Sequence, residues 1–369
     1  MLMAALLIKL GAIPRRAILV TAGVFVGSLL FGYSTVFYPY LPGIAACLAA
    51  LTLVLSPPLS TKKAAAVGGL LGLALVFDFI FIIAVAVIGV FFLAALRPLG
   101  REPAVRRAGV AAAVGALPLG AFAIYCVSIF GSLSIPYRYE ASDYFRNGMA
   151  QGVMGVTAPK PSAMWFLSVH PYRGILFWSP WLIMIIVCCI WLIRHDARLR
   201  PIAIASLVTL IGYFLFNAGY YQWWAGWGMG PRLMTPIFAI VPLALVAACR
   251  ADSPRWLRIG TWSTLTIGVL LCLPLSMIDP QTPGGDDAAV LVSARPWTLV
   301  HAPQLNVLKN FYLLRWADIK PFWAIPIPIS FVLCALVVGA GTTLAYRAAA
   351  VASDVSAPSL TTTDTSTDG

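Results

Sequence analysis

The sequence carries very little charge. Asp, Glu, Lys and Arg make up 10% of its 369 residues, hydrophobic residues make up 60%, and the mean hydropathy is +0.89. A chain this apolar cannot hide its hydrophobic surface in a water-soluble core. The predicted class is therefore an all-α, polytopic integral membrane protein. The formal net charge of +12 would indicate nucleic-acid binding in a soluble protein. Here Lys and Arg fall mainly in short loops between apolar runs, so we expect no nucleic-acid partner.

Three further absences narrow the function. The three histidines have no partner at metal-ligand spacing, so the sequence predicts no metal site. None of the seven cysteines falls in a predicted long outer loop, which argues against a disulfide framework. No glycine-rich phosphate loop follows a strand pattern, and the chain has no room for a soluble nucleotide-binding domain.

Apolar runs long enough to cross a bilayer recur along the chain. A membrane-spanning helix needs roughly 17 to 25 mostly apolar residues. The runs that fit this length lie at about 17–37, 42–58, 108–131, 174–193, 201–217, 233–249, 259–277 and 322–346.

A further run, 64–95, is too long for one span, because it would form a helix of roughly 48 Å. Lys62 and Lys63 precede this run and Arg97 follows it, so both of its ends are expected on the cytoplasmic side. We therefore predict two short helices in a hairpin that turns near Asp78. Asp78 is expected to cap this turn, and a functional role for a carboxylate so near membrane depth is the alternative.

These runs add up to about ten membrane helices, with both termini in the cytoplasm. The basic clusters near 15–16, 194–200 and 250–258 then all fall on the cytoplasmic side. The expected organisation is a cytoplasmic or interfacial N-terminal segment at 1–16, a transmembrane domain at 17–346 with outer loops at about 132–173, 218–232 and 278–321, and a disordered cytoplasmic tail at 347–369.

The second outer loop is the most distinctive stretch of the chain. From Tyr220 to Arg232 it reads Tyr-Tyr-Gln-Trp-Trp-Ala-Gly-Trp-Gly-Met-Gly-Pro-Arg. Glycine lets the backbone approach a ligand, aromatic faces stack on apolar or sugar-ring surfaces, and an arginine fork matches a phosphate or carboxylate. An aromatic belt at the headgroup level explains the tryptophans but not the glycines and the arginine among them. The residues expected to contact a sugar or lipid are Trp223, Trp224, Gly226, Trp227, Gly228 and Gly230.

The outer loop at 132–173 supplies the candidate carboxylates, Glu140 and Asp143. Their spacing of three would put both on one face of a helix, although charged side chains in a loop are usually only solvated. The loop ends in Pro-Tyr-Arg-Gly-Ile-Leu-Phe-Trp-Ser-Pro, in which the arginine is Arg173, and leads into the next span.

Both outer loops resemble polytopic bacterial glycosyltransferases of the GT-C superfamily. The first loop carries the Gly-x-x-Gly-Val stretch that begins at Gly152 and the Pro-Tyr-Arg-Gly motif before the span. In the second, Trp-Ala-Gly-Trp-Gly-Met-Gly-Pro-Arg is similar to the Trp-x-Gly-Gly-x-x-x-Gly-Pro-Arg signature of mannosyltransferase-like members. Those members are related to the protein O-mannosyltransferase and aminoarabinose transferase families. The resemblance covers roughly residues 20–250.

The resemblance implies transfer of a sugar from a polyprenyl-phosphate donor to a lipid or glycan acceptor at the outer face of the plasma membrane. Such a transfer needs a carboxylate to deprotonate the acceptor, and a cation or metal for the leaving phosphate. Arg232 is expected to bind the donor phosphate with help from Arg173, and headgroup pairing is the alternative role. Glu140 and Asp143 are the expected base. A divalent cation is compatible with this chemistry, but the sequence identifies no site for one.

The chain departs from the family at one point. Members carry an acidic residue in the first outer loop, just after the first span, whereas this sequence has no Asp or Glu before Asp78. We expect either a natural start that lies upstream or a loss of the chemistry, so the sequence leaves open whether the chain is an active enzyme. Two other functions remain: a lipid or solute transporter of the flippase kind, and a non-catalytic accessory subunit.

Overall fold

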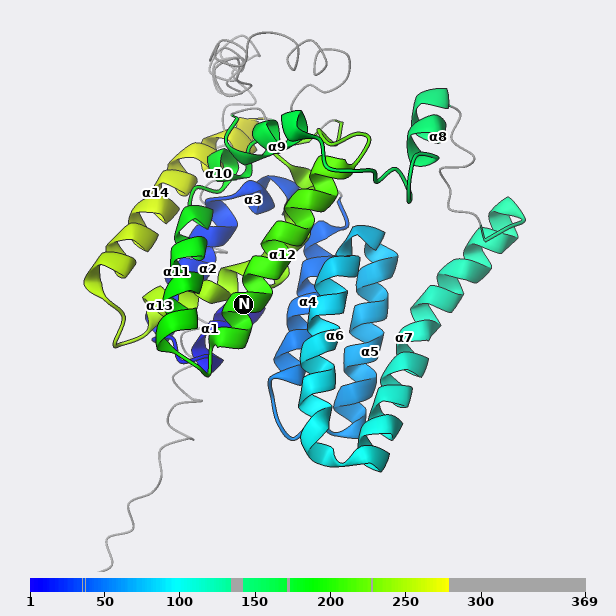
Figure 1. Cartoon of the computed structure of the whole chain (residues 1–369), viewed down its shortest axis with the longest axis horizontal. Coiled ribbons are helices and arrows are strands. Elements are labelled where there is room, and N and C mark those ends of the chain that lie inside the picture. The colour runs from blue at the N-terminus through cyan, green and yellow to red at the C-terminus, as the bar shows by residue number, and fades with distance from the viewer. Residues whose placement is uncertain (35, 37, 134–141, 171–172, 227, 279–369) are drawn as a thin grey trace, which may run out of the picture.

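The computed structural model describes residues 1–34, 36, 38–133, 142–170, 173–226 and 228–278. Within these ranges the chain is helical, with two isolated β-bridges and no strand (Figure 1), so the predicted all-α class is confirmed there. The helices are α1 (Leu2–Lys9), α2 (Pro14–Val26), α3 (Leu29–Ser34), α4 (Tyr40–Val54), α5 (Thr61–Phe77), η1 (Phe79–Phe81), α6 (Ile82–Leu96), η2 (Arg97–Leu99), α7 (Arg101–Phe130), α8 (Asp143–Met149), α9 (Pro161–Ser168), α10 (Ile175–Trp178), α11 (Leu182–His195), α12 (Arg200–Gly219), η4 (Arg232–Ala239), η5 (Val241–Leu245), α13 (Val246–Cys249) and α14 (Arg255–Ile278). The predicted span at 322–346 and the tail at 347–369 lie outside the described residues.

Four stretches of the described chain are long and apolar enough to cross a membrane: Phe79–Leu99, Arg101–Phe130, Arg200–Gly219 and Arg255–Leu273. These helices indicate a membrane protein. The last three correspond to the predicted spans at 108–131, 201–217 and 259–277.

The long apolar run at 64–95 divides as predicted. α5 ends at Phe77 and η1 begins at Phe79, so Asp78 forms the turn between them. Asp78 Oδ1 accepts a hydrogen bond from the backbone N–H of Ile80 at 3.1 Å, as an N-cap side chain does. The division of this run at Asp78 and the capping role of Asp78 are therefore confirmed, whereas the second half, Phe79–Leu99, is longer than the short helix that we predicted.

The predicted span at 17–37 is wrong as a single helix. It forms α2 and α3, which separate after Gly27. A methyl carbon at Gly27 would lie 2.9 Å from the backbone nitrogen of Val269, so α14 passes very close to this break. Run length does not reveal such a break, which lies against a helix more than 200 residues away in the sequence.

Two more predicted spans are broken at or beside proline, which lacks the N–H that continues a helix. The run at 174–193 forms α10 and α11, with Pro180 between them. The run at 233–249 forms η4, η5 and α13, with Pro236 and Pro242 inside its 3₁₀ turns. Its two halves bend by 51°, which makes a broken span or a re-entrant loop.

The N-terminal segment is part of the helical core. Leu6 and Leu7 of α1 have no exposed surface, and α1 packs against α2, α4 and η5. The apolar side chains of α1 thus lie against other helices, and the cytoplasmic or interfacial position of 1–16 stays a prediction.

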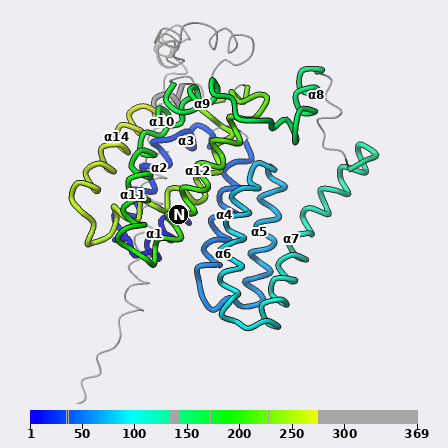
Figure 2. Tube along the Cα trace, viewed as in Figure 1, coloured from blue at the N-terminus to red at the C-terminus, as the bar shows by residue number. Residues whose placement is uncertain are grey.

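The helices α5 and α7 pack in parallel through small residues, with Gly68 against Ala111 and Gly72 against Gly115. A methyl group at Gly68 would overlap the carbonyl oxygen of Ala111, so the backbones touch directly, as at many membrane-helix interfaces. The trace in Figure 2 shows that the second half of α7 moves away from α5 and toward α8.

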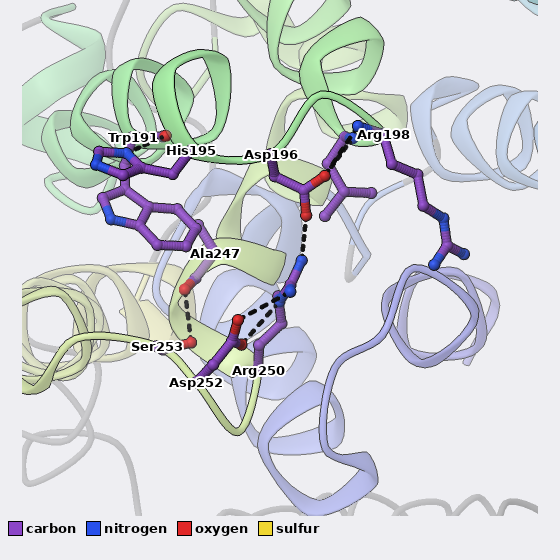
Figure 3. A network of polar contacts seen from close by, with 9 residues as sticks. Trp191, His195, Asp196, Arg198, Ala247, Arg250, Asp252 and Ser253 are labelled. Carbon is purple, nitrogen blue, oxygen red and sulfur yellow. Dashed lines mark hydrogen bonds and ion pairs between the residues drawn. The ribbon is translucent and has the colours of Figure 1, made fainter.

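The two ends of the helical body differ in composition. At one end, below in Figure 1, the basic turns converge: Arg16 donates to the backbone oxygen of Arg250, and Arg250 in turn pairs with Asp196 and Asp252 (Figure 3). We call this the basic end. At the other end, above in Figure 1, α3, α9, α10 and the C-terminal end of α12 gather with residues 220–226 and 228–232. We call this the aromatic end.

Candidate functional site

The described parts of the second loop, 220–226 and 228–232, fold around Arg173. Nη1 of this arginine donates to the backbone oxygens of Gly228 and Gly230, the latter at 2.9 Å, and Nη2 donates to that of Gly226 at 2.7 Å. The side chain has no exposed surface. Arg173 thus holds the loop in shape, and its contacts do not support the phosphate-binding role that the sequence predicts.

The loop glycines serve this shape. Gly226 and Gly230 have positive φ, 62° and 57°, where a side chain is strained. A methyl carbon at Gly230 would also lie 2.9 Å from Cγ of Trp178. The backbone oxygens of Gly226, Gly228 and Gly230 point to Arg173, so a sugar or lipid contact through these oxygens is not what the structure provides.

Two loop tryptophans, Trp223 and Trp224, differ in burial and in the rings that they contact. Trp223 is buried and stacks on Phe166 of α9, with ring centroids 5.5 Å apart and planes 22° apart. Trp224 is half-buried and packs edge-on against Trp223 at 5.6 Å. Trp223 therefore fastens the loop to α9 through this stacking, and its expected contact with a sugar or lipid stays a prediction. Trp227 lies outside the described residues.

A cavity of about 290 Å³ opens beside this loop at the aromatic end. Tyr40 lines it from the start of α4 and Tyr38 from just before that helix. Asp78 lines it from the hairpin turn, Phe145 from α8 and Arg232 from the start of η4. The end of α12 and the first half of the loop complete the wall. Segments that are far apart in the sequence thus bring a cation, a carboxylate and phenol groups to one cavity.

Arg232 keeps part of its guanidinium free in this cavity. Nη1 donates to the hydroxyl of Tyr38 at 2.9 Å, and the guanidinium carbon lies 5.4 Å from the centroid of the Tyr38 ring. Neither Nε nor Nη2 has a hydrogen-bond partner, and no carboxylate forms an ion pair with Arg232, among the described residues. The Nε and Nη2 edge of a guanidinium is the side that binds a phosphate or carboxylate with two parallel hydrogen bonds.

A cluster of tyrosines positions Arg232 and was not predicted. The rings of Tyr33, Tyr38 and Tyr40 lie 5.2 to 5.4 Å apart, and the hydroxyl of Tyr33 donates to the backbone oxygen of Met229 at 2.6 Å. The signal in the sequence is the spacing of three tyrosines at the end of the first predicted span.

Of the two predicted carboxylates, the one within the described residues does not line the cavity. Asp143 begins α8, has 79% of its side chain exposed and pairs with Arg146 in the same helix. This i, i+3 surface pair leaves Asp143 in solvent and outside the described lining of the cavity, so its expected role as base stays a prediction without support from this arrangement. Glu140 lies outside the described residues. The carboxylate that lines the cavity is Asp78, which the sequence predicts as a cap.

No group of three or more His, Cys, Asp or Glu side chains that could hold a metal ion occurs in the part of the chain that the structure describes. The charged side chains that line the cavity there are Arg232 and Asp78.

No known protein family, curated protein or solved structure matches this chain. Its function is therefore inferred from the residues of the site.

Proposed function

We propose that this protein is a polytopic membrane glycosyltransferase of the GT-C kind, which transfers a sugar from a polyprenyl-phosphate donor to a hydroxyl of a lipid or glycan acceptor. The observation that carries the proposal is the free edge of Arg232 in a cavity with aromatic walls. A donor phosphate would satisfy Nε and Nη2, and the adjacent aromatic rings would accommodate a sugar ring.

The proposal includes an orientation in the plasma membrane. The basic end would face the cytoplasm with both termini, and the cavity would open at the outer face, because cytoplasmic turns are enriched in Lys and Arg. About ten spans would then include the four long apolar helices, shorter apolar helices such as Tyr40–Val54 and Leu182–His195, and the run at 322–346.

Binding of polyprenyl phosphate to the protein in lipid nanodiscs tests the phosphate contact, with the uncharged polyprenol as the matched ligand. We expect the wild type to prefer the phosphate. Both Arg232→Ala and Arg232→Lys should lose about 10- to 100-fold in affinity, since a hydrogen bond to a charged group contributes about 1.5–3 kcal/mol and lysine cannot bind side-on. Arg250→Lys at the basic end is the control and should bind as the wild type does.

Turnover then separates the functions that share this contact. Transfer from a panel of polyprenyl-phosphate hexoses to alkyl glycosides, in protein reconstituted in liposomes, would support the transferase. Donor binding without transfer would indicate the accessory subunit, and movement of the lipid between leaflets without transfer would indicate the flippase. Unchanged phosphate binding in both Arg232 variants would refute the proposed site.

A further inference from the structure

The carboxylate of Asp78 has two oxygens, and the capping hydrogen bond uses one of them. Oδ1 accepts the hydrogen bond from Ile80 N–H, while Oδ2 has no hydrogen-bond partner among the described residues. The residue lies in the turn outside α5 and η1 and lines the cavity. The free oxygen therefore remains for a ligand in that cavity.

Asp78 differs from the other aspartates that the structure describes. Asp143, Asp196 and Asp252 each form an ion pair with an arginine within 4 Å, whereas Asp78 forms none. Asp78 and Arg232 line the same cavity without pairing directly. An anion on Arg232 and a hydroxyl beside Asp78 could thus occupy the space between the two side chains together.

The surroundings of Asp78 also favour proton uptake. Burial raises the pKa of this carboxyl, while the Ile80 N–H and the charge of Arg232 offset part of that rise. A carboxylate with a raised pKa accepts a proton more readily from an attacking hydroxyl.

We propose that Asp78 is the general base of this cavity and that the acceptor hydroxyl binds between its free oxygen and the donor sugar held by Arg232. This role rests on the proposed function. In the step, the acceptor oxygen forms a bond to the anomeric carbon of the sugar while the bond from that carbon to the phosphate oxygen breaks. The electron pair of the broken bond goes to the phosphate, which leaves as polyprenyl phosphate beside Arg232. The proton of the acceptor hydroxyl goes to Asp78, so the products are the glycoside, polyprenyl phosphate and a protonated Asp78 that returns its proton to water.

The variant that tests this role is Asp78→Asn, because asparagine caps a helix about as well as aspartate but cannot take the proton. We expect unchanged polyprenyl-phosphate binding, an unchanged thermal unfolding midpoint, and transfer reduced by about 10²- to 10⁴-fold. Asp78→Ser, which also caps, should behave in the same way. Asp196→Asn is the matched control: it replaces an aspartate in a turn at the basic end, where Asp196 accepts from the backbone N–H of Arg198 at 2.9 Å, and should transfer as the wild type does.

The outcomes separate this role from the proposed function. Wild-type transfer together with full transfer by Asp78→Asn or Asp78→Ser would overturn the role of Asp78 and leave the glycosyltransferase intact. Loss of transfer that is matched by loss of polyprenyl-phosphate binding in both variants would also overturn it, because the residue would then be needed to shape the site. Wild-type protein that neither binds polyprenyl phosphate nor transfers a sugar would overturn both.

Discussion

The two ends of the molecule neutralise arginine in different ways. At the basic end, Arg250 donates to Asp252 from Nε and Nη2, each at 2.9 Å, and from Nη1 to Asp196, so all three nitrogens have carboxylate partners (Figure 3). At the aromatic end, Arg232 has one phenol partner and two nitrogens with none among the described residues. All hydrogen-bonding nitrogens of Arg250 are paired with carboxylates, whereas Arg232 keeps nitrogens that an anionic ligand can bind.

This difference has an energetic meaning. A partly buried charge without a counter-charge is costly, so it is retained where a ligand supplies the missing charge. Arg173 provides a third case, because it is buried and donates to three backbone oxygens. A buried arginine therefore indicates a ligand only after its hydrogen-bond partners have been counted.

The largest effect is expected at Arg173. Arg173→Met would remove the guanidinium that donates to the backbone oxygens of Gly226, Gly228 and Gly230, although the Gly230 oxygen keeps the backbone N–H of Arg232 as a donor at 3.1 Å. Each buried acceptor that loses its donor costs about 1–3 kcal/mol, so we expect more than about 2 kcal/mol of destabilisation. The thermal unfolding midpoint in detergent measures this loss. Arg198→Met, an exposed arginine at the basic end, is the control and should unfold as the wild type does. Equal midpoints for the two variants would show that Arg173 does not support the loop.

A smaller loss is expected at Gly230. Gly230→Ala would place a side chain at positive φ against Trp178, which should cost about 2 kcal/mol and weaken polyprenyl-phosphate binding, because Arg232 follows in the chain. Gly109→Ala on α7 is the matched control. A methyl group there meets nothing within 4 Å, so helix propensity alone should stabilise by up to about 1 kcal/mol. A Gly230→Ala protein as stable as the wild type would mean that the loop tolerates a different shape.

A carboxylate placed beside Arg232 would remove its difference from Arg250. Gln222 lines the cavity, and both its amide nitrogen and Nη2 of Arg232 lie within 4 Å of a methyl carbon placed at Gly226. Gln222→Glu should therefore pair with Arg232 and lower polyprenyl-phosphate affinity about tenfold, roughly 1.4 kcal/mol, without lowering the unfolding midpoint. Gln151→Glu, an exposed change of the same kind, should leave affinity unaltered. Affinity that is unaltered by Gln222→Glu would argue against phosphate binding at Arg232.

The sequence predicts features that depend on local length and charge. The hairpin at 64–95 follows from its excess length and from the basic residues at both ends, and the structure divides it at Asp78. The roles of Arg173 and Arg232 could not be told apart in this way. Arg173 meets its partners 53 to 57 residues later in the chain, and Arg232 meets Tyr38 across 194 residues. Loop composition shows which residue types are present, but the packing of distant helices decides which arginine is hydrogen-bonded within the protein and which has free nitrogens.

The smallest effect is expected at the basic end, where the contacts are partly exposed. Hydrogen bonds from Arg250 hold the pKa of Asp252 below its usual value of 3.8. A lowered folded-state pKa stabilises the protein above the unfolded-state value, and this contribution is lost as the pH falls through the folded-state value. Arg250→Gln should therefore lower the unfolding midpoint near neutral pH by the equivalent of about 1 kcal/mol or less. That difference from the wild type should shrink as the pH falls below 3.8 and Asp252 becomes protonated.

Unfolding midpoints measured from pH 7 to about pH 3 provide the check. A difference that stays constant across this range would mean that Arg250 stabilises the basic end through packing of its side chain, and its contrast with Arg232 would then not be one of charge pairing.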